Sequence, residues 1–154
     1  MTQIIFYSSA PLQVENTLFT LIEKSIEKGY KSLLLFLDKE KCSMIDEKLW
    51  TYKQNSFLPH LSEDEEISDE IDIPIYLSTK NENPYKAELL FSIDGFLPDN
   101  ISNFKRLIII IDGNDKILLE KYKKYYLDIN KDFEDIVFYK SDDNGKWIEE
   151  NFMR

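Results

Sequence analysis

Two uninterrupted apolar runs constrain the fold of this chain most strongly. They cover residues 33–37 and 107–111, and each has the length of a strand. A strand that is apolar on both faces is usually central in a parallel sheet, with helices covering it on each side. We therefore expect a three-layer α/β structure.

Strand and helix patterns alternate around these runs. Residues 12–28 have apolar side chains at three- and four-residue spacing, which predicts a helix that ends at Gly29. Right-handed crossovers then place successive strands side by side. Further helices are expected over 39–50 and from 114 or 115 to 129, and strands over 3–7, 32–37, 73–77, 88–93, 106–111 and 136–140, with short ones possible at 56–58 and 146–148.

The charge of the chain is concentrated in one segment. The net charge is −10, and residues 61–72 contain seven acids and no base, so removing them leaves 22 acids against 19 bases, or −3. We expect 61–72 to be an acidic surface loop. A protein that covers the DNA backbone needs a basic footprint, which argues against direct nucleic-acid binding.

The chain lacks the residues that several common binding sites require. The first strand-to-helix turn, residues 7–11, has no glycine that would let a phosphate approach the backbone. One cysteine and one histidine give no metal-ligand spacing, so no cofactor or metal is expected. No span or signal peptide is visible, and a lone Cys42 fits a reducing cytoplasm. Residues 1–154 are thus expected to form a single Rossmann-like domain without a nucleotide site and with a mixed, mostly parallel sheet.

The segment that contains the only histidine, His60, is rich in large apolar side chains. One interpretation is an α/β enzyme or small-molecule-binding domain that uses His60 as a base. The other is an exposed hydrophobic groove for a partner protein, because aromatic residues commonly anchor interfaces. Filling of the core is the alternative for any single residue. The groove would be formed by Trp50, Tyr52, Phe57, Leu58 and Pro59.

The last helix combines an apolar stripe with lysines. Leu118, Tyr122, Tyr125 and Ile129 are spaced to be buried together, and residues 115–126 carry four lysines against two acids. Lysines are ordinary on helix surfaces. They could also form, with tyrosine walls, a pocket for an acidic peptide.

Several motifs in this order resemble the chi subunit of bacterial DNA polymerase III holoenzyme. The most specific is Leu49-Trp50 followed by Ser-Phe-Leu-Pro-His over residues 56–60. Supporting motifs are Phe6-Tyr7, Asp46-Glu47, Pro74-Ile75, Lys121-Tyr122-Lys123-x-Tyr125 and Gly145-Lys146-Trp147.

The resemblance implies a non-catalytic accessory subunit of the clamp-loader assembly. Chi-like proteins bridge the clamp loader, through the small psi subunit, to single-stranded DNA-binding protein, and they hold the acidic, Phe-ended tail of the latter. The family's helix pattern Arg-x-x-Tyr-x-x-x-Arg keeps only Tyr122 here, because Leu119 and Tyr126 stand in the arginine places. The expected tail-binding residues are Lys116, Leu119, Lys121, Tyr122, Lys123, Lys124 and Tyr126, and the expected residues for psi or another clamp-loader subunit are Trp50, Phe57, Leu58 and Pro59.

Overall fold

The computed structural model describes residues 2–51, 59–63 and 73–153. Among these residues, eight strands form one sheet in the order β3-β4-β2-β5-β6-β1-β7-β8, in which every neighbouring pair is parallel except β7 and β8. The strands are β1 (Gln3–Ser9), β2 (Ser32–Leu35), β3 (His60–Ser62), β4 (Ile75–Ser78), β5 (Leu89–Ser92), β6 (Arg106–Asp112), β7 (Ile136–Ser141) and β8 (Trp147–Glu149).

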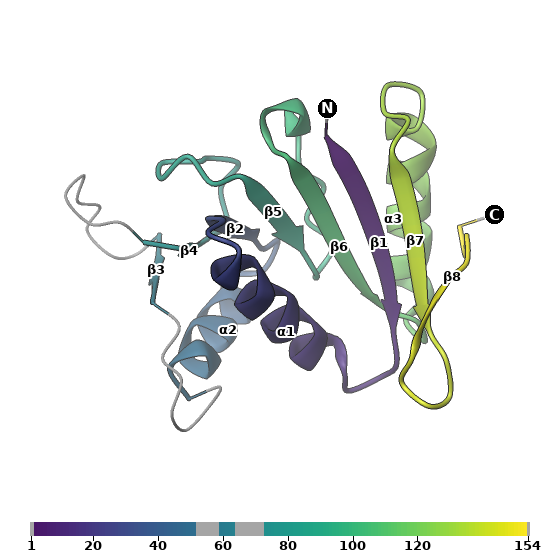
Figure 1. Cartoon of the computed structure of the whole chain (residues 1–154), viewed down its shortest axis with the longest axis horizontal. Helices are drawn as coiled ribbons and strands as arrows, with labels where there is room; N and C mark the ends of the chain where they lie inside the picture. Colours follow the sequence, from purple (N-terminus) through teal and green to yellow (C-terminus); the bar gives the residue numbers. More distant parts are fainter. Residues whose placement is uncertain (1, 52–58, 64–72, 154) are drawn as a thin grey trace.

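Helices cover both faces of this sheet. Helices α1 (Val14–Glu27) and α2 (Lys39–Thr51) lie in front of it in Figure 1, and α3 (Lys116–Ile129) lies behind. A short 3-10 helix, η1 (Ile101–Asn103), precedes β6. The expected three-layer α/β fold with a mostly parallel sheet is therefore confirmed. In the described residues, no helix is long and apolar enough to span a bilayer.

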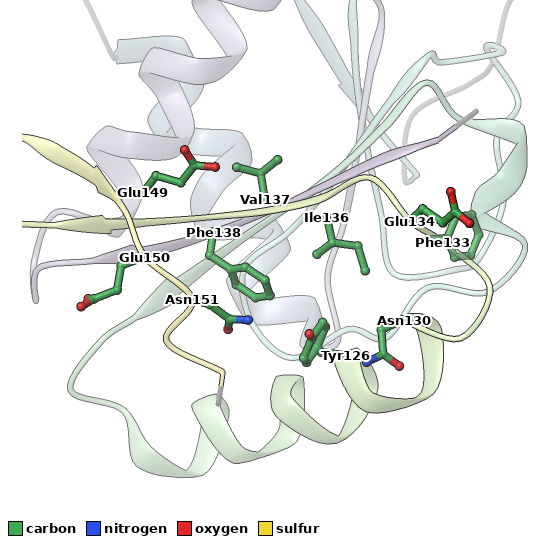
Figure 2. Close-up of a pocket in the computed structure, with 10 residues that line it drawn as sticks. All are labelled: Tyr126, Asn130, Phe133, Glu134, Ile136, Val137, Phe138, Glu149, Glu150 and Asn151. Atoms are coloured by element: carbon green, nitrogen blue, oxygen red, sulfur yellow. The ribbon is translucent and has the colours of Figure 1, made fainter.

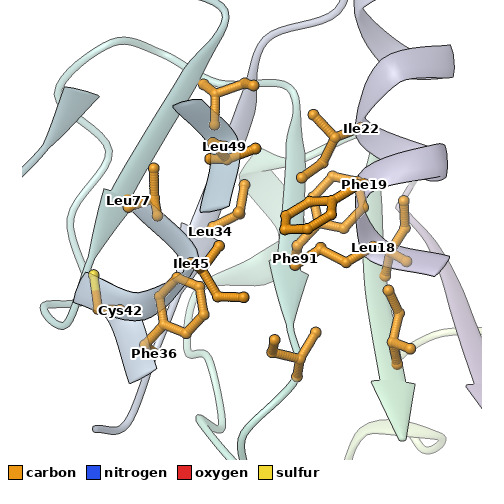
Figure 3. Close-up of a cluster of buried hydrophobic side chains, with 14 of the residues drawn as sticks. Leu18, Phe19, Ile22, Leu34, Phe36, Cys42, Ile45, Leu49, Leu77 and Phe91 are labelled. Carbon is orange, nitrogen blue, oxygen red and sulfur yellow. The ribbon is translucent and has the colours of Figure 1, made fainter. Parts of the chain in front are cut away.

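The two apolar runs lie where their composition predicted, at the centre of the sheet. Alternate residues of β2 point to opposite layers: Leu34 packs with Leu18 and Ile45 of the front helices, as Figure 3 shows. Leu33 and Leu35 belong to the second layer, which includes Tyr122 of α3. A strand with a core on each side must be apolar on both faces.

Two element ends differ from the predicted ones for local reasons. The apolar run 32–37 is a strand only to Leu35, because the Leu37 amide leaves the ladder and donates to the Asp94 carboxylate at 2.8 and 2.9 Å. Helix α1 starts at Val14 rather than at residue 12, because Leu12 has a left-handed φ of +70° that no helix can contain. Its predicted end is confirmed, since Gly29 has a φ of +83°.

The acidic segment begins later than expected. Leu61 and Ser62 belong to β3, which pairs in parallel with β4, so the prediction that the loop starts at residue 61 was wrong. Glu63 accepts hydrogen bonds from Lys39 at 3.0 Å and Thr79 at 2.5 Å. Burial would raise its pKa, but these bonds outweigh burial and lower the pKa to about 2. The rest of the predicted loop, 64–72, and the predicted strand 56–58 lie outside the described residues.

Candidate protein-binding surfaces

His60 lies in a buried corner between α2 and β3. The residue is 3% exposed, and its Nε2 lies 3.1 Å from the Asp46 carbonyl oxygen and 3.0 Å from an Asp46 carboxylate oxygen. The Trp50 ring meets the imidazole edge-on, with the ring centroids 4.8 Å apart. A histidine enclosed in this way ties β3 to the end of α2 and cannot reach a substrate, which counts against an enzyme that uses His60 as a base.

The indole of Trp50 covers this corner from outside. It is 54% exposed, although it is among the largest apolar side chains of the protein. Pro59, just before β3, is also exposed. Exposed tryptophans are common anchors of protein interfaces. The other two residues predicted for this surface, Phe57 and Leu58, lie outside the described residues, so the partner surface stays a prediction.

The tyrosine at the centre of α3 is part of the core. Tyr122 is 0% exposed, and its hydroxyl lies 2.6 Å from Ser92 Oγ and accepts a 2.8 Å hydrogen bond from the Gly95 amide. Ser92 donates its own proton to the Phe96 carbonyl at 2.7 Å, so Tyr122 must donate to Ser92. Burial raises the pKa of Tyr122 well above its ordinary value, against the lowering effect of these hydrogen bonds. The phenol is therefore neutral and offers no surface to a peptide.

The lysines predicted for tail binding surround α3 rather than form one cluster. Lys116 and Lys124 are exposed, whereas Lys121 and Lys123 are half-buried. At 100° per residue, Lys121 and Lys123 flank opposite sides of the helix, and Glu120 stands between Lys116 and Lys124 on the outer row. Within the described parts of the chain, none of the four forms an ion pair. They remain available to an anionic partner.

Lys121 contacts the loop that follows β5. A Cβ placed on Gly95 would lie 3.2 Å from Lys121 Nζ and 3.3 Å from a Leu118 methyl, and Gly95 has a φ of +97°. Only glycine suits this conformation and space. The ammonium of Lys121 thus lies near the side chain of Leu118.

The two residues in the places of the family's arginines, Leu119 and Tyr126, pack partly against the core. The Tyr126 ring meets Phe138 edge-on with centroids 5.2 Å apart. Tyr126 also lines a cavity of about 540 Å³ between α3, β7 and the segment after β8, where Ile136 and Phe138 point from β7 toward the helix (Figure 2). Glu134, Glu149 and Glu150 line the same cavity. Such carboxylates repel an acidic peptide, so this side of α3 does not suit an acidic tail.

The sequence analysis missed one further surface. A crevice at the carboxyl edge of the sheet is lined by Leu12 and Leu37 and by several carboxylates. The signal was present as an aspartate directly after each of three strand patterns: Asp38, Asp94 and Asp112. Among the described residues, no group of three His, Cys, Asp or Glu side chains could hold a metal ion.

Comparisons with known proteins found matches that cover most of the chain. A family model described as "DNA polymerase III chi subunit, HolC" matches residues 1–132. A protein of Rickettsia prowazekii named "Probable DNA polymerase III subunit chi" is 32% identical over 139 residues, covering 85% of this chain and 79% of that protein. "DNA polymerase III subunit chi" of Pseudomonas aeruginosa is 25% identical over 131 residues, covering 81% of this chain and 89% of that protein. The resemblance seen in the motifs is confirmed: this chain belongs to the family of DNA polymerase III chi subunits, which are accessory subunits rather than catalytic enzymes.

Proposed function

We propose that this protein links the clamp loader of DNA polymerase III to single-stranded DNA-binding protein by holding the acidic, Phe-ended tail of the latter on α3. It works in the cytoplasm and contacts DNA only through that partner. Membership of the chi-subunit family supports the accessory role in replication. The net charge of −10 supports the absence of direct DNA contact.

One observation carries the tail-binding proposal. Of the described α-helices, α3 is the one on which lysines outnumber carboxylates, by four to two, and its lysines have no ion-pair partner within the described residues. Lys121 lies beside Leu118. An ammonium next to an aliphatic wall suits a peptide that ends in a phenylalanine carboxylate.

The surroundings of α3 restrict the path of the tail. Carboxylates line the cavity beside Tyr126 and the crevice before Leu118, so both regions repel an acidic peptide. The tail therefore runs from Lys121 toward Lys124. Lysines replace the family's arginines here and give point charges without the bidentate fork, so each contact contributes less.

The test is fluorescence anisotropy of a labelled acidic peptide ending in Pro-Phe. We expect Lys121→Ala with Lys124→Ala to weaken binding about fivefold to tenfold at low ionic strength, and to make the remaining affinity less dependent on salt. The matched control is Lys24→Ala on α1 with Lys28→Ala directly after it, since α1 covers the opposite face of the sheet, and it should change affinity less than twofold. No binding of the peptide to the unmodified protein at low salt would sink the tail-binding proposal.

On the clamp-loader side, the exposed indole of Trp50 is the anchor for psi or for another clamp-loader subunit. The support is its exposure of 54% over a rigid corner, since its ring packs on the buried His60. A large aromatic side chain held in one position loses little entropy when a partner covers it.

A further inference from the structure

A crevice opens at the point where the strand connections diverge. From the neighbouring strands β1 and β6, α1 leaves over the front face of the sheet and α3 over the back face (Figure 1). The beginnings of both helices, together with the ends of β2 and β5, enclose a cavity of about 740 Å³. In open α/β sheets this is the usual position of a ligand site.

The charge of this crevice excludes the anionic ligands that bind there in many such folds. Five carboxylates line it against two lysines, Lys41 and Lys48, and both lysines pair with Glu15, at 3.7 and 2.5 Å. Four aspartates are left, and the net charge of the lining is −3. A ligand that gains energy here must be cationic.

These aspartates are held in place by backbone amides. Asp94 accepts from the amides of Leu37 and Asp38, and Asp112 accepts from that of Asn114 at 2.9 Å. Asp115 caps α3 by accepting from Leu118 at 3.0 Å. The negative charges are therefore preorganised and do not depend on a ligand for their position.

Two leucines stand on the rim of the crevice. Leu12 is 94% exposed and Leu37 is 60% exposed, and both line the cavity. Leu12 also has a φ of +70°. This left-handed conformation is costly for leucine, whereas glycine or asparagine adopts it more easily. The exposure of Leu12 shows that burial of the side chain among the described residues does not compensate this strain. Strained residues of this kind cluster at binding sites.

We propose that this crevice binds a cationic segment of a partner protein, with lysine or arginine side chains toward the aspartates and an aliphatic side chain between Leu12 and Leu37. Charge complementarity selects the cationic part. The exposed leucines select a peptide, because a small cation on the crevice floor would leave Leu12 in water. The site borders the proposed tail-binding flank of α3 at Leu118, but it takes a cationic segment, whereas that flank takes an acidic peptide.

The experiment uses the full chain labelled with nitrogen-15 and two short amidated peptides. Both carry the same lysines, but one has leucines where the other has serines. We expect the leucine peptide to shift the amide resonances of Leu12, Leu37 and Asp94, and the serine peptide to bind about tenfold more weakly. Spermidine is the small-cation probe and should also bind more weakly than the leucine peptide.

Two variants separate binding from folding. Leu12→Asn suits the left-handed backbone, so the melting temperature should not fall, while affinity for the leucine peptide drops about fivefold or more. Asp112→Asn with Asp115→Asn keeps both capping oxygens, removes two charges and should weaken binding about tenfold. The control is Asp135→Asn at the other edge of the sheet, whose carboxylate accepts from the Gln3 side chain. Equal binding of the two peptides, equal binding of spermidine, shifts located elsewhere, or unchanged affinity of Leu12→Asn would each overturn the proposal.

Discussion

A buried chain of hydrogen bonds fixes the loop after β5 to helix α3. The Gly95 amide donates to Tyr122, Tyr122 donates to Ser92, and Ser92 donates to the Phe96 carbonyl. The chain begins and ends in the same loop, so one phenol holds that loop in shape. Lys121 directly precedes Tyr122 on the helix, and its side chain lies against Gly95. The position of the proposed tail-binding lysine therefore depends on a tyrosine that no peptide touches.

We expect Tyr122→Phe to lower the free energy of unfolding by about 1 to 3 kcal/mol, because it leaves the buried Gly95 amide without its acceptor. Urea unfolding followed by fluorescence measures the change. Tyr126→Phe on the same helix is the matched control, because no described group hydrogen-bonds to its hydroxyl, and it should stay within about 0.5 kcal/mol. A loss in Tyr122→Phe no larger than that of the control would contradict the role given to the phenol.

At the scale of single residues, helical spacing predicted which side chains of α3 face the core but not what they do there. Tyr122 was expected in the buried stripe and is buried. Its hydroxyl partners are Ser92 and Gly95, about thirty positions earlier, and no local pattern identifies them. The partners of His60 in its buried corner, Asp46 and Trp50, were likewise not identified by any local pattern.

The helices differ in how their first turns are closed. Helix α3 begins after Asp115, whose carboxylate accepts from the Leu118 amide. Helix α1 begins after Gln13, whose side chain makes no such capping bond. The amides of a first turn need an acceptor, and a carboxylate there also meets the positive end of the helix dipole.

Asp115→Ala should therefore destabilise the protein by about 1 kcal/mol, the usual value of an N-cap. Gln13→Ala, the matched change at the other helix, should cost less than about 0.5 kcal/mol. Thermal and urea unfolding of the two variants provide the comparison. If both changes cost the same, the capping bond of Asp115 contributes nothing beyond an ordinary surface contact.

At the scale of elements, strong periodicity predicted the long helices and central strands. Of the three-residue elements, β8 lies where a short strand was expected, at 146–148, whereas β3 and η1 were not predicted. Strand β3 has three residues after a proline, and it is a strand only because β4 offers a free edge to pair with. The 3-10 helix η1 is also three residues long. Elements of this length are decided by tertiary contacts, which a window of sequence does not contain.

Two of the candidate surfaces lie on opposite layers of the molecule. Trp50 belongs to α2 in the front layer, and the lysines belong to α3 in the back layer (Figure 1). Two partners bound on opposite faces of a sheet do not collide. A rigid core between them transmits little structural change from one binding site to the other. Binding of one should leave the affinity for the other nearly unchanged, because the coupling free energy is close to zero.

We expect Trp50→Ala to weaken binding to the purified clamp-loader assembly tenfold or more, a loss typical of an interface anchor, with the tail peptide unaffected. The variant with Lys121→Ala and Lys124→Ala should show the opposite pattern. Surface plasmon resonance with each partner, alone and in the presence of the other, measures both affinities. Competition between the peptide and the clamp loader would show that the two surfaces overlap.

At this scale, the apolar runs were enough to predict the layered architecture, because a strand buried on both faces needs two layers of helices. The crevice could not be predicted in the same way. Its lining comes from the ends of β1, β2, β5 and β6, which are spread over about a hundred positions and meet only because the strands are parallel.

The strand order has a consequence for how this protein is made. Strand β1 is synthesised long before its partners, β6 and β7, which cover Arg106–Asp112 and Ile136–Ser141. Until those residues are synthesised, both edges of the apolar strand β1 lack hydrogen-bonding partners. Pairings between such distant segments are slow to form and expose the nascent chain to aggregation. The sheet should therefore form only after β7 has been synthesised, and β1 should depend on protection until then.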